Sequence, residues 1–385
     1  MTSEWRTIRA ADFIDFNPRL SLKKGDIATK VAMDKLKPFT KKIPETEKAE
    51  FNGGAKFCNG DTVMARITPC LENGKTAYVD MLDDGEIGFG STEFIVMRAK
   101  KGISDPQFVY YTAINPVFRN VAIKSMVGSS GRQRVQQSVL EELELSVPDL
   151  DEQRRIGDFL ARIDEKIALN DRINDNLLAQ AQTLYKQFFP YGVQDDLPDG
   201  WRIGTVGEII EIHDSKRIPL SGADRSKMEK KIYPYYGAAS LMDLVDNYIF
   251  DGKYLLLGED GTVVDDAGYP ILQYVWGQFW VNNHAHILTG RLGYDVESLY
   301  MLFKQTPVKS IVTGAVQPKI SQANLRSVQV VIPPEHNLRE YNDLVEPLFS
   351  LFRANEEECK TFTALRDTLL PKLMSGEIDV SAVQL

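Results

Sequence analysis

Cysteine is scarce in this sequence, and long apolar runs are missing. Cys58, Cys70 and Cys359 are an odd number without CxxC spacing, so neither a disulfide framework nor a structural zinc site is indicated, and we expect reduced thiols. No stretch of 18 apolar residues occurs, and the first residues lack the apolar core of a signal peptide. The sequence therefore predicts a cytoplasmic protein with no membrane partner.

Positive charge is also scarce overall. There are 45 Lys and Arg against 54 Asp and Glu, a net charge of -9, which argues against a protein that neutralises DNA phosphates by itself. The charge is segregated, however. Residues 19–48 hold nine basic against four acidic residues, residues 216–231 six against two, and residues 141–165 three against nine. The two basic runs recur at equivalent places in the two halves of the chain, which favours a binding role, although either run could be a solvated surface.

The chain contains an internal duplication. With a shift of 185 positions, Pro148 falls on Pro333 and Leu184 on Leu369, within an ungapped correspondence of about 65 residues. The dipeptide Trp-Arg opens each copy, at residues 5 and 201, with a different shift. The difference between the copies therefore lies in their front, globular segments.

Each copy ends in a long amphipathic segment. Residues 151–189 predict one helix closed by Pro190, with apolar residues at alternating steps of four and three, which is typical of a coiled coil. About 39 residues would span ~58 Å, so an antiparallel pair would separate two globular parts like a ruler. Each stripe could instead pack only on its own globular neighbour. Pro347 predicts that the second helix starts or kinks there.

The predicted seam between the helices is apolar at both ends and polar in the middle. Asn170 and Asn355 occupy polar seam positions, which would fix the register of the pair. The helix-pairing residues that we predict are Ile156, Leu160, Ile163, Ile167, Asn170, Leu177, Leu184, Leu348, Phe352, Asn355, Phe362 and Leu369.

The globular segments contain short alternating runs between glycine-rich turns. Residues 62–67, 93–98, 254–257 and 286–288 read as strands, as do the two runs before the prolines, 143–147 and 328–332. Helical patterns cover residues 106–115 and 296–305. The sequence thus predicts an α/β (α+β) class with two strand-rich domains, two long antiparallel coiled-coil helices and pseudo-twofold internal duplication.

The last loop of each globular segment is dense in polar groups. These loops read Gly-Ser-Ser-Gly-Arg-Gln-Arg over 128–134 and Thr-Gly-Ala-Val-Gln-Pro-Lys over 313–319. Small residues let a backbone approach a ligand, and Arg, Gln and Lys donate to phosphates and base edges. Each loop alone could be an ordinary surface turn.

Several motifs in a fixed order resemble a known family. They are Pro-Asp-Gly-Trp at 198–201, Tyr-Pro-Tyr-Tyr-Gly-Ala at 233–238, Leu-Gly-Glu-Asp-Gly at 257–261, Asn-His-Ala-His at 283–286, Gly-Ala-Val-Gln-Pro-Lys-Ile at 314–320, and the helix segments 152–156, 163–167 and 184–189. Together with the duplication, they resemble the specificity subunits of Type I restriction-modification systems over nearly the whole chain. The second copy departs from the first at 336–338, where the first has Asp-Glu-Gln at 151–153.

The resemblance implies two target recognition domains, 1–150 and 191–335, a central conserved spacer helix, 151–190, and a C-terminal spacer helix and tail, 336–385. It implies that the domains read the two halves of an asymmetric double-stranded DNA target, with their loops in successive major-groove regions. The chain would be a non-catalytic scaffold for two methyltransferase subunits, which would bind S-adenosylmethionine and methylate adenine. Two restriction subunits that use ATP and Mg²⁺ could join them.

The basic runs and polar loops supply the candidate DNA-binding residues. They are Lys23, Lys24, Lys41, Lys42, Ser129, Ser130, Arg132, Gln133, Arg134, Lys216, Arg217, Arg225, Lys227, Lys230, Lys231, Tyr236, Gly314, Gln317 and Lys319.

Three other functions have weaker support in the sequence. A coiled-coil adaptor that binds only protein would explain the helices. A metal-dependent nuclease would use Asp199, Asp214 and Lys216, but such short patterns recur by chance. A methyltransferase lacks the Asn-Pro-Pro-aromatic sequence that holds a flipped adenine. His284 and His286 share a strand face without a third ligand nearby, and Asp260-Gly261 reads as a tight turn, so no metal site is predicted.

Overall fold

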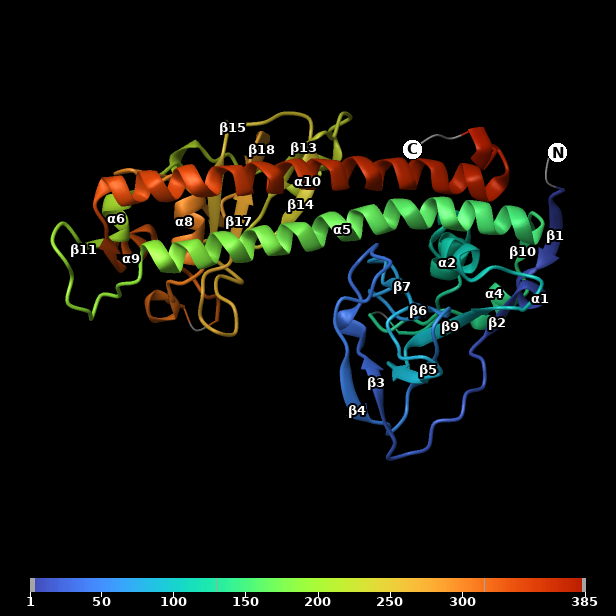
Figure 1. Ribbon diagram of the computed structural model, residues 1–385. Coiled ribbons are helices and arrows are strands. Elements are labelled where there is room, and N and C mark those ends of the chain that lie inside the picture. Colours follow the sequence, from blue (N-terminus) through green and yellow to red (C-terminus); the bar gives the residue numbers. More distant parts are fainter. Residues whose placement is uncertain (1–3, 130, 315, 383–385) are drawn as a thin grey trace. The chain divides into compact units, whose positions relative to one another are not determined.

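Two long helices and several small sheets form the computed structural model, which describes residues 4–129, 131–314 and 316–382 (Figure 1). The chain divides into two compact units: residues up to 172 together with those from 355 onward, and residues 173–354. Each unit holds a sheet-rich part, here called the first strand domain (residues 4–149) and the second strand domain (residues 190–334), and a segment of each long helix. The division into four parts at 150, 190 and 335 remains a prediction, because both compact units cut across the helices.

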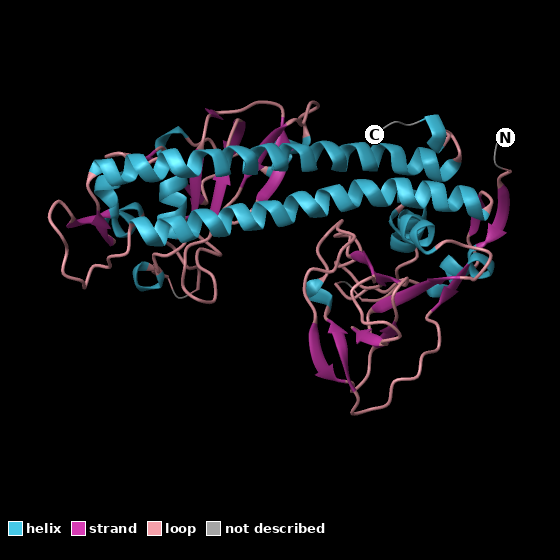
Figure 2. Ribbon diagram, viewed as in Figure 1, coloured by secondary structure: helices cyan, strands magenta, loops and turns pink. Residues whose placement is uncertain are grey.

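The first strand domain contains two four-stranded sheets and a separate strand pair (Figure 2). The sheets have the orders β2-β9-β6-β7 and β4-β3-β8-β5, and β1 pairs antiparallel with β10. The strands are β1 (Arg6–Arg9), β2 (Ile14–Phe16), β3 (Ile27–Val31), β4 (Glu47–Glu50), β5 (Ala55–Phe57), β6 (Thr62–Ala65), β7 (Thr76–Tyr78), β8 (Gly88–Gly90), β9 (Phe94–Ala99) and β10 (Glu144–Val147). The helices are α1 (Ala10–Phe13), α2 (Pro106–Ile114), α3 (Pro116–Lys124) and α4 (Gln137–Glu141), with a 3₁₀ turn at Met33–Lys35.

The second strand domain repeats this topology strand for strand. Its sheets have the orders β12-β19-β16-β17 and β14-β13-β18-β15, and β11 pairs antiparallel with β20. The strands are β11 (Arg202–Thr205), β12 (Ile210–Ile212), β13 (Tyr233–Tyr236), β14 (Leu241–Val245), β15 (Phe250–Asp251), β16 (Tyr254–Gly258), β17 (Leu272–Val275), β18 (Gln278–Val281), β19 (Ala285–Gly290) and β20 (Gln329–Ile332). The helices are α6 (Val206–Ile209), α7 (Gly222–Ser226), α8 (Val296–Phe303) and α9 (Gln322–Ser327), with 3₁₀ turns at Asp214–Lys216 and Lys309–Ile311.

The registers of equivalent strand pairs show which residues of the two domains correspond. Ala65 pairs with Phe94 where β6 meets β9, and Gly258 pairs with Ala285 where β16 meets β19. Just beyond, the Arg66 amide donates to the Glu93 carbonyl, and the Glu259 amide donates to the His284 carbonyl. Arg66 therefore corresponds to Glu259, and Glu93 to His284, although their sequences give no such match.

The helix inside each strand domain begins at a strong cap. Asp105 accepts hydrogen bonds from the amides of Gln107 and Phe108, and Pro106 occupies the first turn. Asp295 caps α8 in a reciprocal capping box with Ser298. Such caps satisfy amides that have no partner inside the helix. Both helices are largely buried. The helices predicted at 106–115 and 296–305 are confirmed, as are the six predicted strand runs.

The long helices are α5 (Leu150–Phe188) and α10 (Glu335–Ser375), followed by a 3₁₀ turn at Val380–Ala382. In the unit of the first strand domain, Asp164 and Asn170 of α5 contact Arg366 and Glu358 of α10, so the segments run antiparallel. In the other unit, the side-chain amide of Asn174 donates to the Phe352 carbonyl, and the Tyr341 hydroxyl donates to the Ala181 carbonyl. These contacts again require antiparallel segments. The predicted coiled-coil pairing is confirmed within each unit.

All twelve predicted seam residues are buried or half-buried. The apolar stripe of α5 packs against both α10 and the first strand domain, because Ile156 and Leu160 lie in one core with residues of α2 and with Leu373 of α10. The alternative, in which each stripe packs only on its own globular neighbour, is therefore wrong, because the stripe also contacts the other long helix. The prediction that the second helix starts at Pro347 is wrong, since α10 begins twelve residues earlier and continues through the proline. Pro347 is exposed, so its ring has room on the outer face.

Candidate nucleic-acid interface

The two polar loops are closed at their bases in the same way. Val127 and Arg134 exchange both backbone hydrogen bonds, and Thr313 and Lys319 do the same in the second strand domain. Arg134 also bridges to Ile67 after β6, and Lys319 to Asp260 after β16. Each loop is therefore a protruding turn anchored to the end of a central strand.

The tips of these loops point into solvent. Ser129 and Arg132 are exposed, as are Gly314 and Gln317, and Val316 is 99% exposed. Gly314 has a φ of +85°, and a Cβ there would come 2.3 Å from the Gln317 carbonyl oxygen, so this turn requires glycine. Gln133 is half-buried and accepts from Thr68 through its carbonyl. The candidate Ser130 lies outside the described residues.

Cations at the loop bases are engaged with acids. Arg134 holds both carboxylate oxygens of Glu93 at 2.6–3.0 Å, and this hydrogen bonding lowers the pKa of Glu93, with burial opposing it. Lys319 lies 3.3 Å from Glu259. Both residues were predicted to contact DNA. Their structural positions make them anchors of the loops as well.

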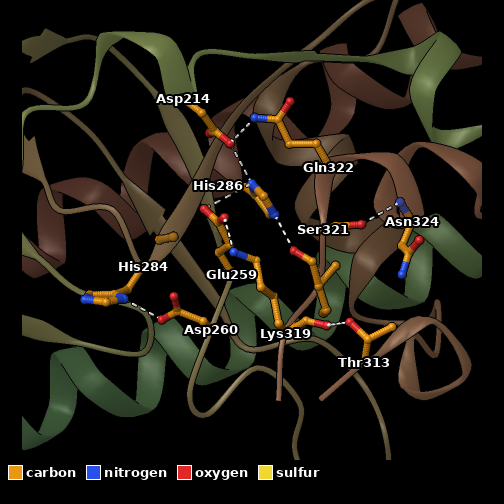
Figure 3. A network of polar contacts seen from close by, with 12 residues as sticks. Asp214, Glu259, Asp260, His284, His286, Thr313, Lys319, Ser321, Gln322 and Asn324 are labelled. Carbon is orange, nitrogen blue, oxygen red and sulfur yellow. Dashed lines mark hydrogen bonds and ion pairs between the residues drawn. The ribbon is translucent and has the colours of Figure 1, made fainter. Parts of the chain in front are cut away.

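Asp214, Glu259 and His286 form a buried polar network beneath the second loop (Figure 3). His286 Nδ1 lies 2.6 Å from Asp214 Oδ2, and Nε2 lies 2.8 Å from the Ile320 carbonyl oxygen. Arg217 donates to Glu259 at 2.6 Å and lies 3.4 Å from Asp214. The network joins the end of β16 to the segment that leaves the loop.

Three ligand atoms of this network lie close enough to hold a metal ion, but their chemistry favours an ion-pair cluster. Both ring nitrogens of His286 are already engaged, one with the Asp214 carboxylate and the other with the Ile320 carbonyl oxygen, so neither is open to a metal in this arrangement. Arg217 and Lys319 already supply positive charge to the carboxylates. Burial would raise the pKa of Asp214, but hydrogen bonds from His286 and Ile287 lower it. The other histidine, His284, pairs with Asp260 instead.

The residues of the nuclease pattern are not arranged as one site. The Asp214 carboxylate accepts from His286, Gln322 and the Ile287 amide. Lys216 and Asp199 are exposed, and no contact joins either of them to the Asp214 carboxylate within the described residues. A carboxylate so occupied is a poor ligand for Mg²⁺.

The first basic run is divided between surface and interior. Lys23 and Lys24 are exposed, and Lys42 pairs with Asp80. Lys41 was expected on the DNA-facing surface, but it is 5% exposed. Its ammonium donates to Gln107 and, at 3.2 Å, to the Tyr111 hydroxyl. Burial lowers the pKa of Lys41 to about 8, so this lysine is a core residue and is not placed to contact a phosphate.

The second basic run is largely on the surface. Lys216, Lys227 and Lys230 are exposed. Asp243 lies near two of the remaining cations, at 3.1 Å from Arg225 and 3.3 Å from Lys231. Arg225 also lies over the ring of Tyr235, and Tyr236, the aromatic candidate, is half-buried. The exposed lysines of this run remain the better placed to meet DNA phosphates.

A protein-family model described as Type I restriction modification DNA specificity domain matches residues 3–179 and residues 198–358. The chain belongs to this family. The two matches cover nearly all of the two strand domains and the first part of the long helix that follows each of them, so the duplication read from the sequence is a duplication of the specificity domain. The predicted family is confirmed, and neither the adaptor nor the nuclease alternative gains support from it.

Curated relatives carry the same designation. The Type I restriction enzyme MjaIX specificity subunit of Methanocaldococcus jannaschii is 22% identical over 290 residues, 67% of this chain and 66% of that protein. The MjaVIII specificity subunit of the same organism is 19% identical, with 98% of this chain and 93% of that protein covered. The EcoAI specificity subunit of Escherichia coli is 34% identical over 126 residues, 33% of this chain and 21% of that protein.

A solved structure shares the fold. The S subunit of a Type I restriction-modification system from M. genitalium has a TM-score of 0.54 at 18% identity, with 96% of both chains covered. The mixed α/β class with two strand-rich domains and long helices is therefore confirmed. No helix in the described part of the chain has the length and apolar character needed to cross a membrane.

In this member of the specificity family, a basic cleft was missed by sequence reasoning. It is formed by Arg19, Lys56 and Arg66 of the first strand domain. Lys56 and Arg66 lie outside any run of basic residues, so composition gave no signal for them. A comparison of strand ends between the two copies would have drawn attention to Arg66, because Glu259 stands at its equivalent.

Proposed function

We propose that the chain is the DNA-recognition and scaffold subunit of a Type I restriction-modification complex and reads a two-part, asymmetric target. The observation that carries this proposal is the duplicated specificity domain: one backbone frame occurs twice, with different side chains at the exposed loop tips. Two such frames with different surfaces suit the recognition of two different half-sites.

The charged groups of the strand domains support DNA as the ligand. Lys23, Lys24 and Arg132 in the first domain and Lys227 and Lys230 in the second are exposed. None of them forms an ion pair within the described residues. Surface cations without an ionic partner displace the counterions condensed on DNA when they contact its phosphates, and this release favours binding. Arg132 and Gln317 at the loop tips have side chains suited to base edges.

We propose that catalysis resides in partners. Two methyltransferase subunits that bind S-adenosylmethionine would dock on the scaffold, with or without two restriction subunits that use ATP and Mg²⁺. The complex would act in the cytoplasm, where a prokaryotic cell keeps its DNA. Partners that share the work of clamping DNA would also make the net charge of -9 compatible with DNA binding.

The decisive experiment is a map of methylated adenines in DNA exposed to this chain and its partner methyltransferase. A motif of two parts with a fixed gap supports the proposal, because each half would belong to one strand domain. A single unbroken motif, or methylation independent of this chain, would overturn it.

A second measurement separates DNA recognition from a protein-only adaptor. DNA affinity of the reconstituted complex should fall with salt, and the slope should be smaller in the variants Lys23→Gln/Lys24→Gln and Lys230→Gln/Lys231→Gln. An unchanged slope in both variants would favour the adaptor.

A further inference from the structure

A cleft of about 580 Å³ opens on the first strand domain. It lies between the segment that follows β2, strand β5 and the ends of β6 and β9. Three cationic side chains line it, Arg19, Lys56 and Arg66, and its lining contains no acidic residue. Three positive charges without a compensating acid favour an anionic occupant.

The backbone of Arg66 is held by two hydrogen bonds, whereas its side-chain Nε lacks a hydrogen-bond partner within the described residues. Its amide donates to the Glu93 carbonyl at 2.9 Å, and its carbonyl accepts from the Val135 amide at 2.8 Å. Its Nε is buried and has no hydrogen-bond partner within the described residues. The nearby Glu93 carboxylate is taken by Arg134. A buried donor without an acceptor is costly, so an acceptor brought by a ligand would be stabilising.

Lys56 and Arg19 leave further donors available. Lys56 Nζ donates to the Leu20 carbonyl at 3.0 Å and lies 5.1 Å from the centre of the Phe51 ring. This places the ammonium at the cleft, and an ammonium has three donors. Arg19 is exposed and forms no ion pair within the described residues. The cleft thus offers donors and positive charge from more than one element.

The second strand domain closes the corresponding place with its own side chains. Glu259 stands where the first domain has Arg66, and Arg217 holds it at 2.6 Å. Lys319 approaches the same carboxylate (Figure 3). Arg217 also donates to the carbonyl of Ala285 at 2.8 Å, and Ala285 corresponds by register to Phe94, which lines the cleft of the first domain. An internal ion pair therefore takes the position that is open in the first domain.

We propose that the cleft of Arg19, Lys56 and Arg66 binds a phosphodiester group of the DNA backbone, so that the first domain holds DNA at a point where the second domain does not. This inference rests on the proposed DNA-binding function. Guanidinium groups and an ammonium that line one cleft supply donors suited to the oxygens of a phosphate. Contacts of this kind fix the position of a domain on the duplex and carry no sequence information.

The test measures, as a function of salt, the affinity for random-sequence duplex DNA of the full chain reconstituted with its partner methyltransferase. Arg66→Gln should weaken binding several-fold and lower the slope of log affinity against log salt by about one. Arg66→Gln combined with Lys56→Gln should lower it by about two. Arg66→Lys should retain most of the slope. The matched control is Lys101→Gln, an exposed lysine of the same domain outside the cleft.

The outcomes separate this inference from the function on which it rests. If the wild type binds DNA and Arg66→Gln and Lys101→Gln have equal effects, the proposed role of the cleft is wrong and the proposed function stands. If the wild type does not bind DNA, both proposals are wrong. Thermal unfolding checks that Arg66→Gln folds as the wild type does. Binding of inorganic phosphate that Arg66→Gln abolishes, with DNA affinity unchanged, would assign the cleft to a small anion. In a map of methylated adenines, a loss confined to one base of the first half-site would assign the cleft to a guanine edge.

Discussion

Asp164 of α5 and Arg366 of α10 form an ion pair 2.7 Å long in which each side chain is only 6% exposed. Asp164 also accepts from the Tyr111 hydroxyl of α2 at 2.5 Å. One carboxylate thus joins both long helices to the first strand domain. Arg366 stands in the seam at a position that the heptad pattern would give to an apolar residue.

Removal of one partner of this pair should be strongly destabilising. Asp164→Asn leaves Arg366 buried with only the exposed Asp367 as an ionic partner, and we expect the free energy of unfolding to fall by about 3 kcal/mol, the lower end of the range for a broken buried pair. Replacement of both residues, as Asp164→Leu with Arg366→Met, should recover part of this loss, because the Arg366 charge is removed while the Tyr111 hydroxyl still loses its acceptor. Urea unfolding measures both effects.

The control for the buried pair is Arg154→Met, which removes an exposed i,i+3 pair with Asp151 and should change stability by less than about 1 kcal/mol. If Asp164→Asn were equally mild, the buried pair would contribute little to the union of helices and domain.

Lys41 should make stability depend on pH in the alkaline range. Its pKa is lowered by burial to about 8 in the folded chain, below its value in the unfolded chain. Between pH 8 and about 10.5 the unfolded state binds more protons, so stability rises with pH, by on the order of 3 kcal/mol from this residue. Below pH 8 the contribution is constant, because both states are protonated.

The measurement is the difference in unfolding free energy between wild type and Lys41→Met from pH 7 to 10.5. The unfolding free energy of the wild type minus that of Lys41→Met should rise with pH. The same difference for Lys24→Met, which removes an exposed lysine, should stay constant. Parallel profiles for both variants would mean that Lys41 is solvated in the folded protein.

The seam could be predicted from sequence because its periodicity is a local property of α5 and α10. Lys41 could not, since a lysine in a basic run looks solvated until the fold brings Gln107 and Tyr111 around it. The correspondence of Arg66 with Glu259 was also hidden, because loops of different length separate the copies and only the strand registers restore the match. Predictions therefore succeeded where neighbours along the chain decide the structure and failed where distant segments decide it.

The ion pair of Glu93 and Arg134 should hold the base of the first loop closed. Glu93→Gln removes the charge from this bidentate contact and should speed amide hydrogen exchange at Val127 and Arg134 by about fivefold, equivalent to roughly 1 kcal/mol. Exchange measured by NMR or mass spectrometry reports the change. Glu142→Gln, which removes an exposed partner of Arg9, should leave these amides unaffected. Equal rates in all three proteins would show that the backbone pairing suffices.

The His286 network should stabilise the second strand domain without a metal. Because both imidazole nitrogens of His286 are engaged by oxygens of the chain, neither EDTA nor Zn²⁺ should move the melting temperature by more than about 1 °C, whereas a bound ion would raise it. Asp214→Asn should lower the melting temperature of the second strand domain, since His286 would lose its charged acceptor. A stabilising effect of Zn²⁺ that Asp214→Asn abolishes would establish a metal site.

The loop tips should determine specificity separately in the two domains. Arg132 and Gln317 are exposed on loops whose bases are fixed, so a change at either tip should alter base contacts with little effect on the frame. Arg132→Gln should change the preferred bases in one half of the methylated motif, and Gln317→Ala those in the other half, each with a loss of about 1–3 kcal/mol against the original base.

Sequencing of methylated adenines in DNA treated with each variant and its partner methyltransferase tests this assignment. The gap between the half-sites should stay constant, because neither substitution touches α5 or α10. Lys101→Gln should leave both halves as they are. If Arg132→Gln weakened methylation equally at every site, Arg132 would be a phosphate contact and the bases of that half would be read elsewhere on the first strand domain.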